Sequence, residues 1–150
     1  MKNLILLAAL VLVATALGCC LVSPKPAPPA AGLVGAWKGD STFLDRDLAV
    51  EYGSFPVVVE IAADGSATGS IGSARLAEAL VREREGEFLV EGRLDGDVFA
   101  TGSLPAQGKS LFVMILAAPV DAHTSGNLHL KSNGVFDFTL RVCGLELAKQ

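Results

Sequence analysis

From Leu33 to the C-terminus, apolar and polar positions alternate with a period of two. Successive side chains of a β-strand point to opposite faces, so this pattern predicts strands with one apolar and one polar face. In the run from Phe136 to Val142 we expect Asp137, Thr139 and Arg141 to point outward. Four runs carry the pattern, and their apolar positions are Phe55, Val57, Val59 and Ile61; Phe88, Val90 and Leu94; Val98, Ala100, Gly102 and Leu104; and Phe136, Phe138, Leu140 and Val142.

Turn signals separate these runs. Asp64-Gly65, Asp95-Gly96 and Asn133-Gly134 each lie between alternating segments. Such dipeptides tolerate the positive φ angles of the tight turns that join antiparallel strands. Their spacing predicts an antiparallel meander.

The segment from Ser73 to Glu85 allows two interpretations. It is rich in helix-forming residues, and Leu76 and Leu80 have the spacing of one helix face. Gly72 and Gly86, however, bracket a length that suits a strand of the meander. We expect a strand, with a helix as the alternative.

The segment from Lys109 to Ala118 is apolar on both faces. A strand covered on both sides has this composition. If nothing covers the second face, that face becomes a candidate surface for a partner or a second copy. The residues of this possible partner face are Phe112, Met114 and Leu116, and those of the opposite face are Leu111, Val113 and Ile115.

These segments predict an all-β fold, an antiparallel meander of about eight strands. Closure into a small barrel removes the exposed sheet edges, and a two-sheet sandwich is the alternative. Gly35-Ala36-Trp37, just before the first expected strand, resembles the Gly-x-Trp start of the calycin barrels, which include lipocalins and avidins. In that family the tryptophan plugs one end of the barrel, so the resemblance implies this role for Trp37.

The N-terminus has the features of an export signal. Lys2 precedes an apolar run from Leu4 to Leu17, and small residues follow. Ala16-Leu17-Gly18-Cys19 resembles the lipobox of bacterial lipoproteins. The resemblance implies cleavage before Cys19, lipidation of its sulfur, and tethering of the domain to a membrane in the bacterial cell envelope, on its periplasmic or cell-surface side.

Three alternatives to cleavage before Cys19 stay open. Cleavage before Cys20 would place Leu17 at the position where the family favours leucine. Ala14-Thr15-Ala16 fits an ordinary signal cleavage site that would release a soluble protein. The segment from Leu4 to Val22 is also long and apolar enough to span a bilayer uncleaved.

A proline-rich linker follows. Residues 23–32 read SPKPAPPAAG, with four prolines. Proline fixes φ and removes amide donors, so this stretch predicts an extended spacer between anchor and domain. The chain therefore divides into a signal peptide with its lipobox (1–19), the linker (20–32) and a β-domain (33–150).

Composition narrows the function. The formal net charge is −4, and no basic patch of the kind that binds nucleic acid is present. His123 and His129 would lie about 20 Å apart on one strand, too far to share a metal ion. We find no catalytic motif and expect no metal and no cofactor.

The sequence thus favours a tethered binding module without enzymatic activity. Its barrel would hold a small apolar ligand or dock an envelope partner. A structural lipoprotein with a filled core is the main alternative, and an enzyme is the least favoured one.

Overall fold

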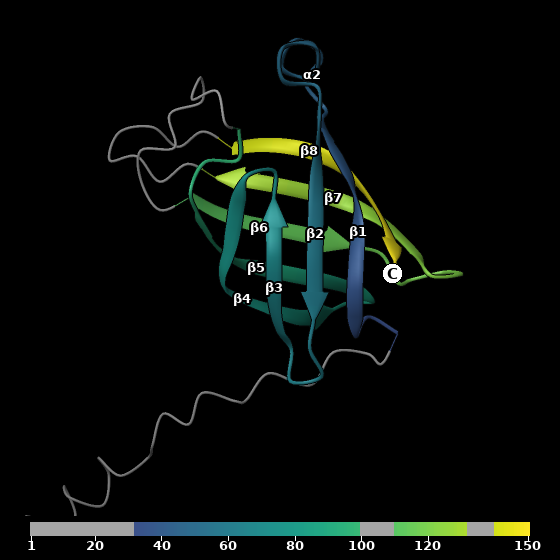
Figure 1. Ribbon diagram of the computed structural model, residues 1–150. Coiled ribbons are helices and arrows are strands. Elements are labelled where there is room, and N and C mark those ends of the chain that lie inside the picture. The colour runs from purple at the N-terminus through teal and green to yellow at the C-terminus, as the bar shows by residue number, and fades with distance from the viewer. Residues whose placement is uncertain (1–31, 100–109, 132–139) are drawn as a thin grey trace, which may run out of the picture.

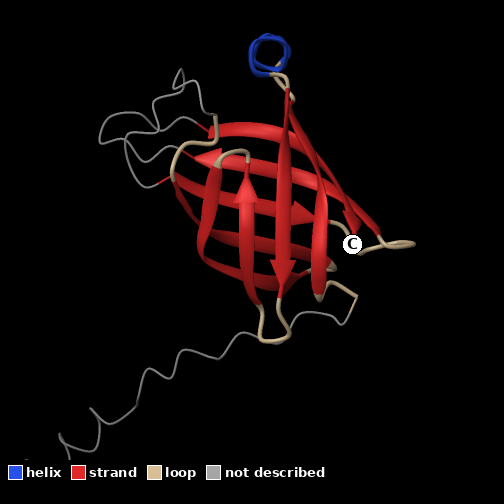
Figure 2. Cartoon of the chain, in the orientation of Figure 1, coloured by secondary structure: helices blue, strands red, loops and turns tan. Residues whose placement is uncertain are grey.

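The computed structural model describes residues 32–99, 110–131 and 140–150, which form an eight-stranded antiparallel β-barrel with one short helix (Figures 1 and 2). Each strand pairs with the next along the chain, and β8 pairs with β1 to close the barrel. The expected all-β meander is confirmed, and closure excludes the sandwich. The elements are β1 (Gly35–Phe43), α2 (Arg46–Tyr52), β2 (Ser54–Ile61), β3 (Ser66–Ile71), β4 (Ala74–Arg84), β5 (Glu87–Asp95), β6 (Ser110–Leu116), β7 (His123–Lys131) and β8 (Leu140–Lys149).

The core lies inside the barrel and consists of one face of each strand. In β2 the predicted apolar positions are all buried, and the residues between them are all exposed. In β5, Phe88, Val90 and Leu94 are buried as expected. Period-two alternation therefore places the correct face of these strands toward the interior.

The segment from Ala74 to Arg84 is strand β4, which confirms the strand interpretation over the helical one. The register with both neighbouring strands shifts near Glu78, whose φ of 53° is left-handed. This irregularity breaks the period of two along β4. The irregular spacing of its apolar residues then reflects a β-bulge, not a helix turn.

Two strand predictions are wrong. In β8 the inward side chains are those of Arg141 and Cys143, because they pair with the inward Leu130 and Leu128 of β7. Val142 points outward, opposite to the prediction, and pairs with His129. The other residues of that predicted run, 136–139, and the Asn133-Gly134 turn lie outside the described residues.

The second error concerns the Asp95-Gly96 turn. Asp95 ends β5, but Val98 and Phe99 are not in a strand, and the next strand of the described residues begins at Ser110. The remainder of the predicted strand at 98–104 lies outside the described residues. By contrast, Asp64-Gly65 forms the turn between β2 and β3, as predicted, with the Gly65 amide donating to the Ala62 carbonyl at 3.0 Å.

Helix α2, which the sequence analysis did not predict, interrupts the connection between β1 and β2. The Asp45 carboxylate accepts hydrogen bonds from the amides of Asp47 and Leu48, both at 3.0 Å, and so caps the helix start. Gly53 ends the helix with a φ of 67°. Leu48, Ala49 and Tyr52 pack partly against the barrel core.

Candidate functional site

The two ends of the barrel differ. The described chain enters at the end that holds Leu33 and Trp37, whereas α2 stands at the opposite end (Figure 1). At the entry end Trp37 is 1% exposed, and its Nε1 donates to the Leu33 carbonyl at 2.8 Å. The Lys149 ammonium lies 5.6 Å from the centre of the indole ring. The entry end is therefore packed around Trp37, and its role as a barrel plug stays a prediction.

Four aromatic rings gather at the α2 end. Phe43 comes from β1, Tyr52 from α2, Phe55 from β2 and Phe99 from the segment after β5. The Phe99 ring lies 5.7 Å from Phe43, 4.8 Å from Tyr52 and 5.1 Å from Phe55, measured between ring centres. Phe43 and Phe55 are buried, and Tyr52 and Phe99 are partly exposed. We call these four residues the aromatic cluster.

Arg141 points into the barrel at this same end. It is the second residue of β8, and its inward neighbour Cys143 pairs with Phe43 of the aromatic cluster. The Arg141 Nε is buried and has no hydrogen-bond partner. Arg141 as a whole is half-buried, whereas the buried polar residues of the described chain, Ser41 and Thr124, donate to the backbone carbonyls of Gly144 and Ala117 at 2.8 Å. Arg141 therefore differs from these two residues, because its buried Nε has no hydrogen-bond partner.

The Tyr52 hydroxyl lies within the electrostatic influence of Arg141. Partial burial of the phenol raises the pKa of Tyr52, and the hydrogen bond and negative charge of Glu51 raise it further. The positive charge of Arg141 acts in the opposite direction. Helix α2 and strand β8 thus bring a phenol and a guanidinium together beside the aromatic cluster.

Deeper in the barrel the interior is filled. Phe112, Met114 and Leu116 are 1%, 0% and 1% exposed, and they face inward from β6. The expectation that they form a partner face is therefore wrong. The outward face of β6 is the alternate set Leu111, Val113 and Ile115, each half-buried. Side chains without exposed area border no water-sized space, so a ligand has no room at this level.

Cys143 belongs to this filled interior. It is fully buried and free. Burial raises the pKa of the Cys143 thiol to about 11, and a hydrogen bond with Ser41 opposes part of this effect. A thiol that stays protonated at neutral pH is a poor nucleophile, so Cys143 acts as a core residue.

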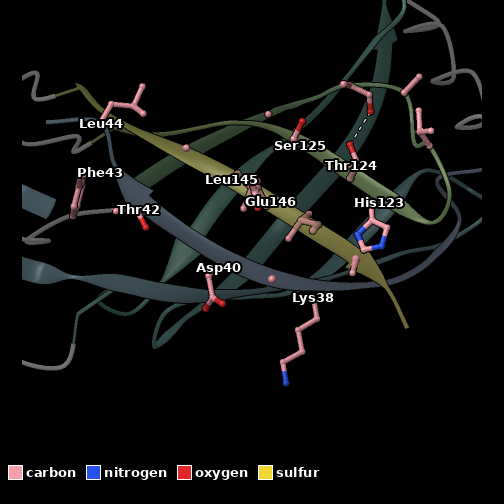
Figure 3. Close-up of a pocket in the computed structure, with 18 residues that line it drawn as sticks. Lys38, Asp40, Thr42, Phe43, Leu44, His123, Thr124, Ser125, Leu145 and Glu146 are labelled. Atoms are coloured by element: carbon pink, nitrogen blue, oxygen red, sulfur yellow. Dashed lines mark hydrogen bonds between the residues drawn. The ribbon is translucent and has the colours of Figure 1, made fainter. Parts of the chain in front are cut away.

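A second feature is a groove on the outer surface of β1, β8 and β7, with a volume of about 1130 Å³. Its walls carry Lys38, Asp40 and Thr42 from β1 and His123 and Ser125 from β7 (Figure 3). The groove is recessed along β8 because the residues that line it there include Gly144, which has no side chain, and Ala148, whose side chain is small. Asp40 and Glu146 pair directly across β1 and β8, so two carboxylates lie side by side there.

The remaining sequence candidates are placed as follows. His123 and His129 both point outward from β7, six residues apart, and His123 lines the groove. No group of three or more metal-ligating side chains occurs among the described residues. Cys19, the predicted lipidation site, lies outside the described residues. In the described part of the chain, no helix has the length and apolar character needed to cross a bilayer.

Sequence reasoning missed the residues that distinguish the α2 end. Tyr52 and Phe99 lie outside the strands, where no periodicity marks them, and Arg141 was assigned to the wrong face. The one available signal was Tyr52, the only tyrosine of the chain, which lies just before the predicted run that begins at Phe55.

Comparison of the chain with protein-family models, with curated proteins and with solved structures finds no match.

Proposed function

We propose that this protein is an exported, lipid-anchored binding module that holds a small apolar molecule at the α2 end of its barrel. The observation that carries the proposal is the aromatic cluster, to which β1, α2, β2 and the segment after β5 contribute one ring each. Aromatic rings supply large apolar contact area, and binding sites in barrels are found at their mouths.

The location of the site follows from the packing. The interior beyond Phe43 and Phe55 is filled, which restricts a ligand to the mouth. Tyr52 and Phe99 are the partly exposed members of the cluster, and neither lies in a strand of the closed sheet. A ligand can therefore displace or rotate these two rings without breaking the hydrogen bonds of the barrel. It would then pack against the buried rings beneath them.

Export and anchoring are supported by the sequence. An apolar run from Leu4 to Leu17 leads to the lipobox-like segment that ends at Cys19, and the proline-rich linker follows. Two or more acyl chains hold a protein on a membrane, whereas one alone binds marginally. A tethered module of this kind would sample ligands in the cell envelope.

Native mass spectrometry of the full chain, purified from a bacterium that exports it, tests the proposal directly. We expect an excess mass that disappears when the protein is denatured. Calorimetric titration with octanamide, a small uncharged apolar probe, should also show saturable binding. Absence of both retained mass and saturable binding would overturn the proposal and favour the structural lipoprotein with a filled core.

Substitutions locate the site. Tyr52→Ala removes one ring of the aromatic cluster and should weaken octanamide binding by about threefold to tenfold, the range for loss of one aromatic contact. Val50→Ala is the matched control, because Val50 lies on the same helix but is 82% exposed and outside the cluster. Equal affinities for the two variants would place the site elsewhere.

The groove on β1, β8 and β7 favours a second candidate function, the docking of an envelope partner. Asp40 and Glu146 form no ion pair within the described residues, so the groove suits a partner segment that carries a positive charge. A lysine-containing peptide should then bind, and Glu146→Gln should weaken it. Glu60→Gln, which removes an exposed carboxylate from β2, is the control. Equal binding by both variants would exclude the groove.

A further inference from the structure

Arg141 combines three properties that rarely occur together. It is a charged residue on the inward face of a barrel strand, its Nε is buried, and that Nε has no hydrogen-bond partner. It also forms no ion pair, since those found in the described chain, Arg82–Glu91 and Arg93–Glu78, lie on the outward face of β4 and β5. Leu130 of β7 pairs with Arg141, and Phe43 of the aromatic cluster lies on β1, the other neighbour of β8, so apolar residues flank Arg141 on both sides.

An unsatisfied buried donor destabilises a fold, and the penalty is larger for a charged group. A leucine or methionine at position 141 would fill the same space without that penalty. The guanidinium cannot lose its charge at any ordinary pH, so it cannot avoid the penalty by deprotonation. A group of this kind is explained if a ligand supplies the missing acceptor.

We propose that the α2-end site binds an apolar molecule with one anionic group, a carboxylate or a chemically similar acid, which pairs with Arg141. This inference rests on the proposed function and names its ligand class. The planar guanidinium suits a carboxylate, because it can donate two parallel N–H groups to the two oxygens. The apolar part of the ligand then packs on the aromatic cluster.

The geometry fixes the direction of the ligand. Arg141 is the second residue of β8, so it lies near the rim, and Cys143 follows it one level deeper, paired with Phe43. An acid group at the rim stays close to water while its apolar body covers the rings. The positive charge of Arg141 lowers the pKa of Tyr52, so the Tyr52 hydroxyl would then lie near the acid group of the ligand as well.

The test compares octanoate with octanamide, two probes of similar size that differ in charge, by calorimetric titration of the full chain. We expect octanoate to bind at least about tenfold more tightly, as a charge-assisted hydrogen bond allows. Arg141→Gln should abolish this preference and leave octanamide binding within about twofold. Arg46→Gln is the matched control, because Arg46 is an exposed arginine of α2 at the same end.

Tyr52 gives an independent readout, because it is the only tyrosine of the chain and its titration can be followed by ultraviolet absorbance. Arg141 lowers the pKa of Tyr52, so Arg141→Gln should raise it in the ligand-free protein. Octanoate should raise it in the wild-type protein and leave it unchanged in Arg141→Gln. A merely structural role of Arg141 would not produce this dependence on octanoate.

Three outcomes separate the two proposals. Preference for octanoate that disappears in Arg141→Gln supports the inference. Equal binding of octanoate and octanamide to the wild-type protein overturns the inference and leaves the proposed function standing. Binding of neither probe overturns the proposed function. Arg141→Met tests whether loss of the octanoate preference could result from misfolding. Because this variant removes an unpaired buried donor, its unfolding temperature should equal or exceed that of the wild type.

Discussion

Ala122 adopts a backbone conformation that favours glycine. Asp121 and Ala122 have φ angles of 48° and 63°, and they form a two-residue turn closed by hydrogen bonds of 2.8 and 2.9 Å between Val120 and His123. Positive φ costs a residue with a Cβ about 1 kcal/mol. Ala122→Gly should therefore raise the free energy of unfolding by about 0.5 kcal/mol, because the entropy of glycine in the unfolded chain offsets about half of the strain that is relieved.

Urea unfolding followed by the fluorescence of the single tryptophan measures this difference. Ala118→Gly is the matched control, because Ala118 is exposed in the same connection and has no positive φ. It should lower the free energy of unfolding by about 0.5 kcal/mol, since glycine only adds freedom to the unfolded chain. The same sign of change in both variants would contradict the backbone argument.

Cys143 predicts a pH dependence of stability. Burial raises its pKa from the ordinary value of 9.0 to about 11, so the folded state keeps the thiol protonated where the unfolded state ionises. The stability contribution of the thiol is complete below pH 9 and decreases as the pH rises from 9 toward 11. At pH 8, Cys143→Ala should have a lower unfolding temperature than the wild type. Between pH 8 and 10.5, however, the unfolding temperature of Cys143→Ala should decrease less than that of the wild type. Parallel loss in both proteins, measured by unfolding temperature, would refute this account.

At the scale of elements, glycine allows neighbouring strands to approach closely as the sheet closes. A Cβ on Gly126 of β7 would lie 1.8 Å from the carbonyl oxygen of Ile115 in β6. A Cβ on Gly39 of β1 would lie 1.8 Å from the carbonyl oxygen of Glu146 in β8. Gly126→Ala must therefore push two paired strands apart. We expect it to lower the free energy of unfolding by about 3 kcal/mol, the usual scale of overpacking.

Gly144→Ala is the control for this prediction. Gly144 lies in the middle of β8, on the strand next to Gly126, and a Cβ there would meet the Leu44 side chain at 3.6 Å and the Thr42 carbonyl oxygen at 4.0 Å, both ordinary van der Waals distances. The substitution should change stability by less than about 0.5 kcal/mol. Comparable destabilisation by both variants would show that glycine acts through backbone freedom, not through close approach.

The elements also show what the sequence could predict. Period-two patterns identified β2 and β5 and assigned their inward faces correctly, because each has an apolar face next to a polar one. The pattern failed in β8, where the inward positions include Arg141 and the outward ones include Val142. A charged residue inside the barrel and an apolar residue outside it invert the pattern. The site itself could not be predicted, because Tyr52 and Phe99 reach it from outside the strands.

At the scale of the whole molecule, the two ends of the barrel differ in how they are packed. The described chain begins at Gly32, beside the packed end, where the Lys149 ammonium donates to the Gly32 carbonyl at 3.3 Å. The aromatic cluster and Arg141 lie at the opposite end. A domain tethered through residues 20–32 would therefore present its candidate site away from the point of attachment. This polarity suits a ligand that arrives from the aqueous side of the envelope.

The tether can be tested by two neighbouring cysteines. If Cys19 carries the lipid, Cys19→Ser should move the full chain from the detergent phase to the aqueous phase in a detergent partition experiment, because the acyl chains supply the membrane affinity. Cys20→Ser should leave the partition unchanged. The reverse result would place the cleavage before Cys20. Retention of both variants with the membrane would favour the segment from Leu4 to Val22 as an uncleaved helix, and the lipid anchor would then be excluded.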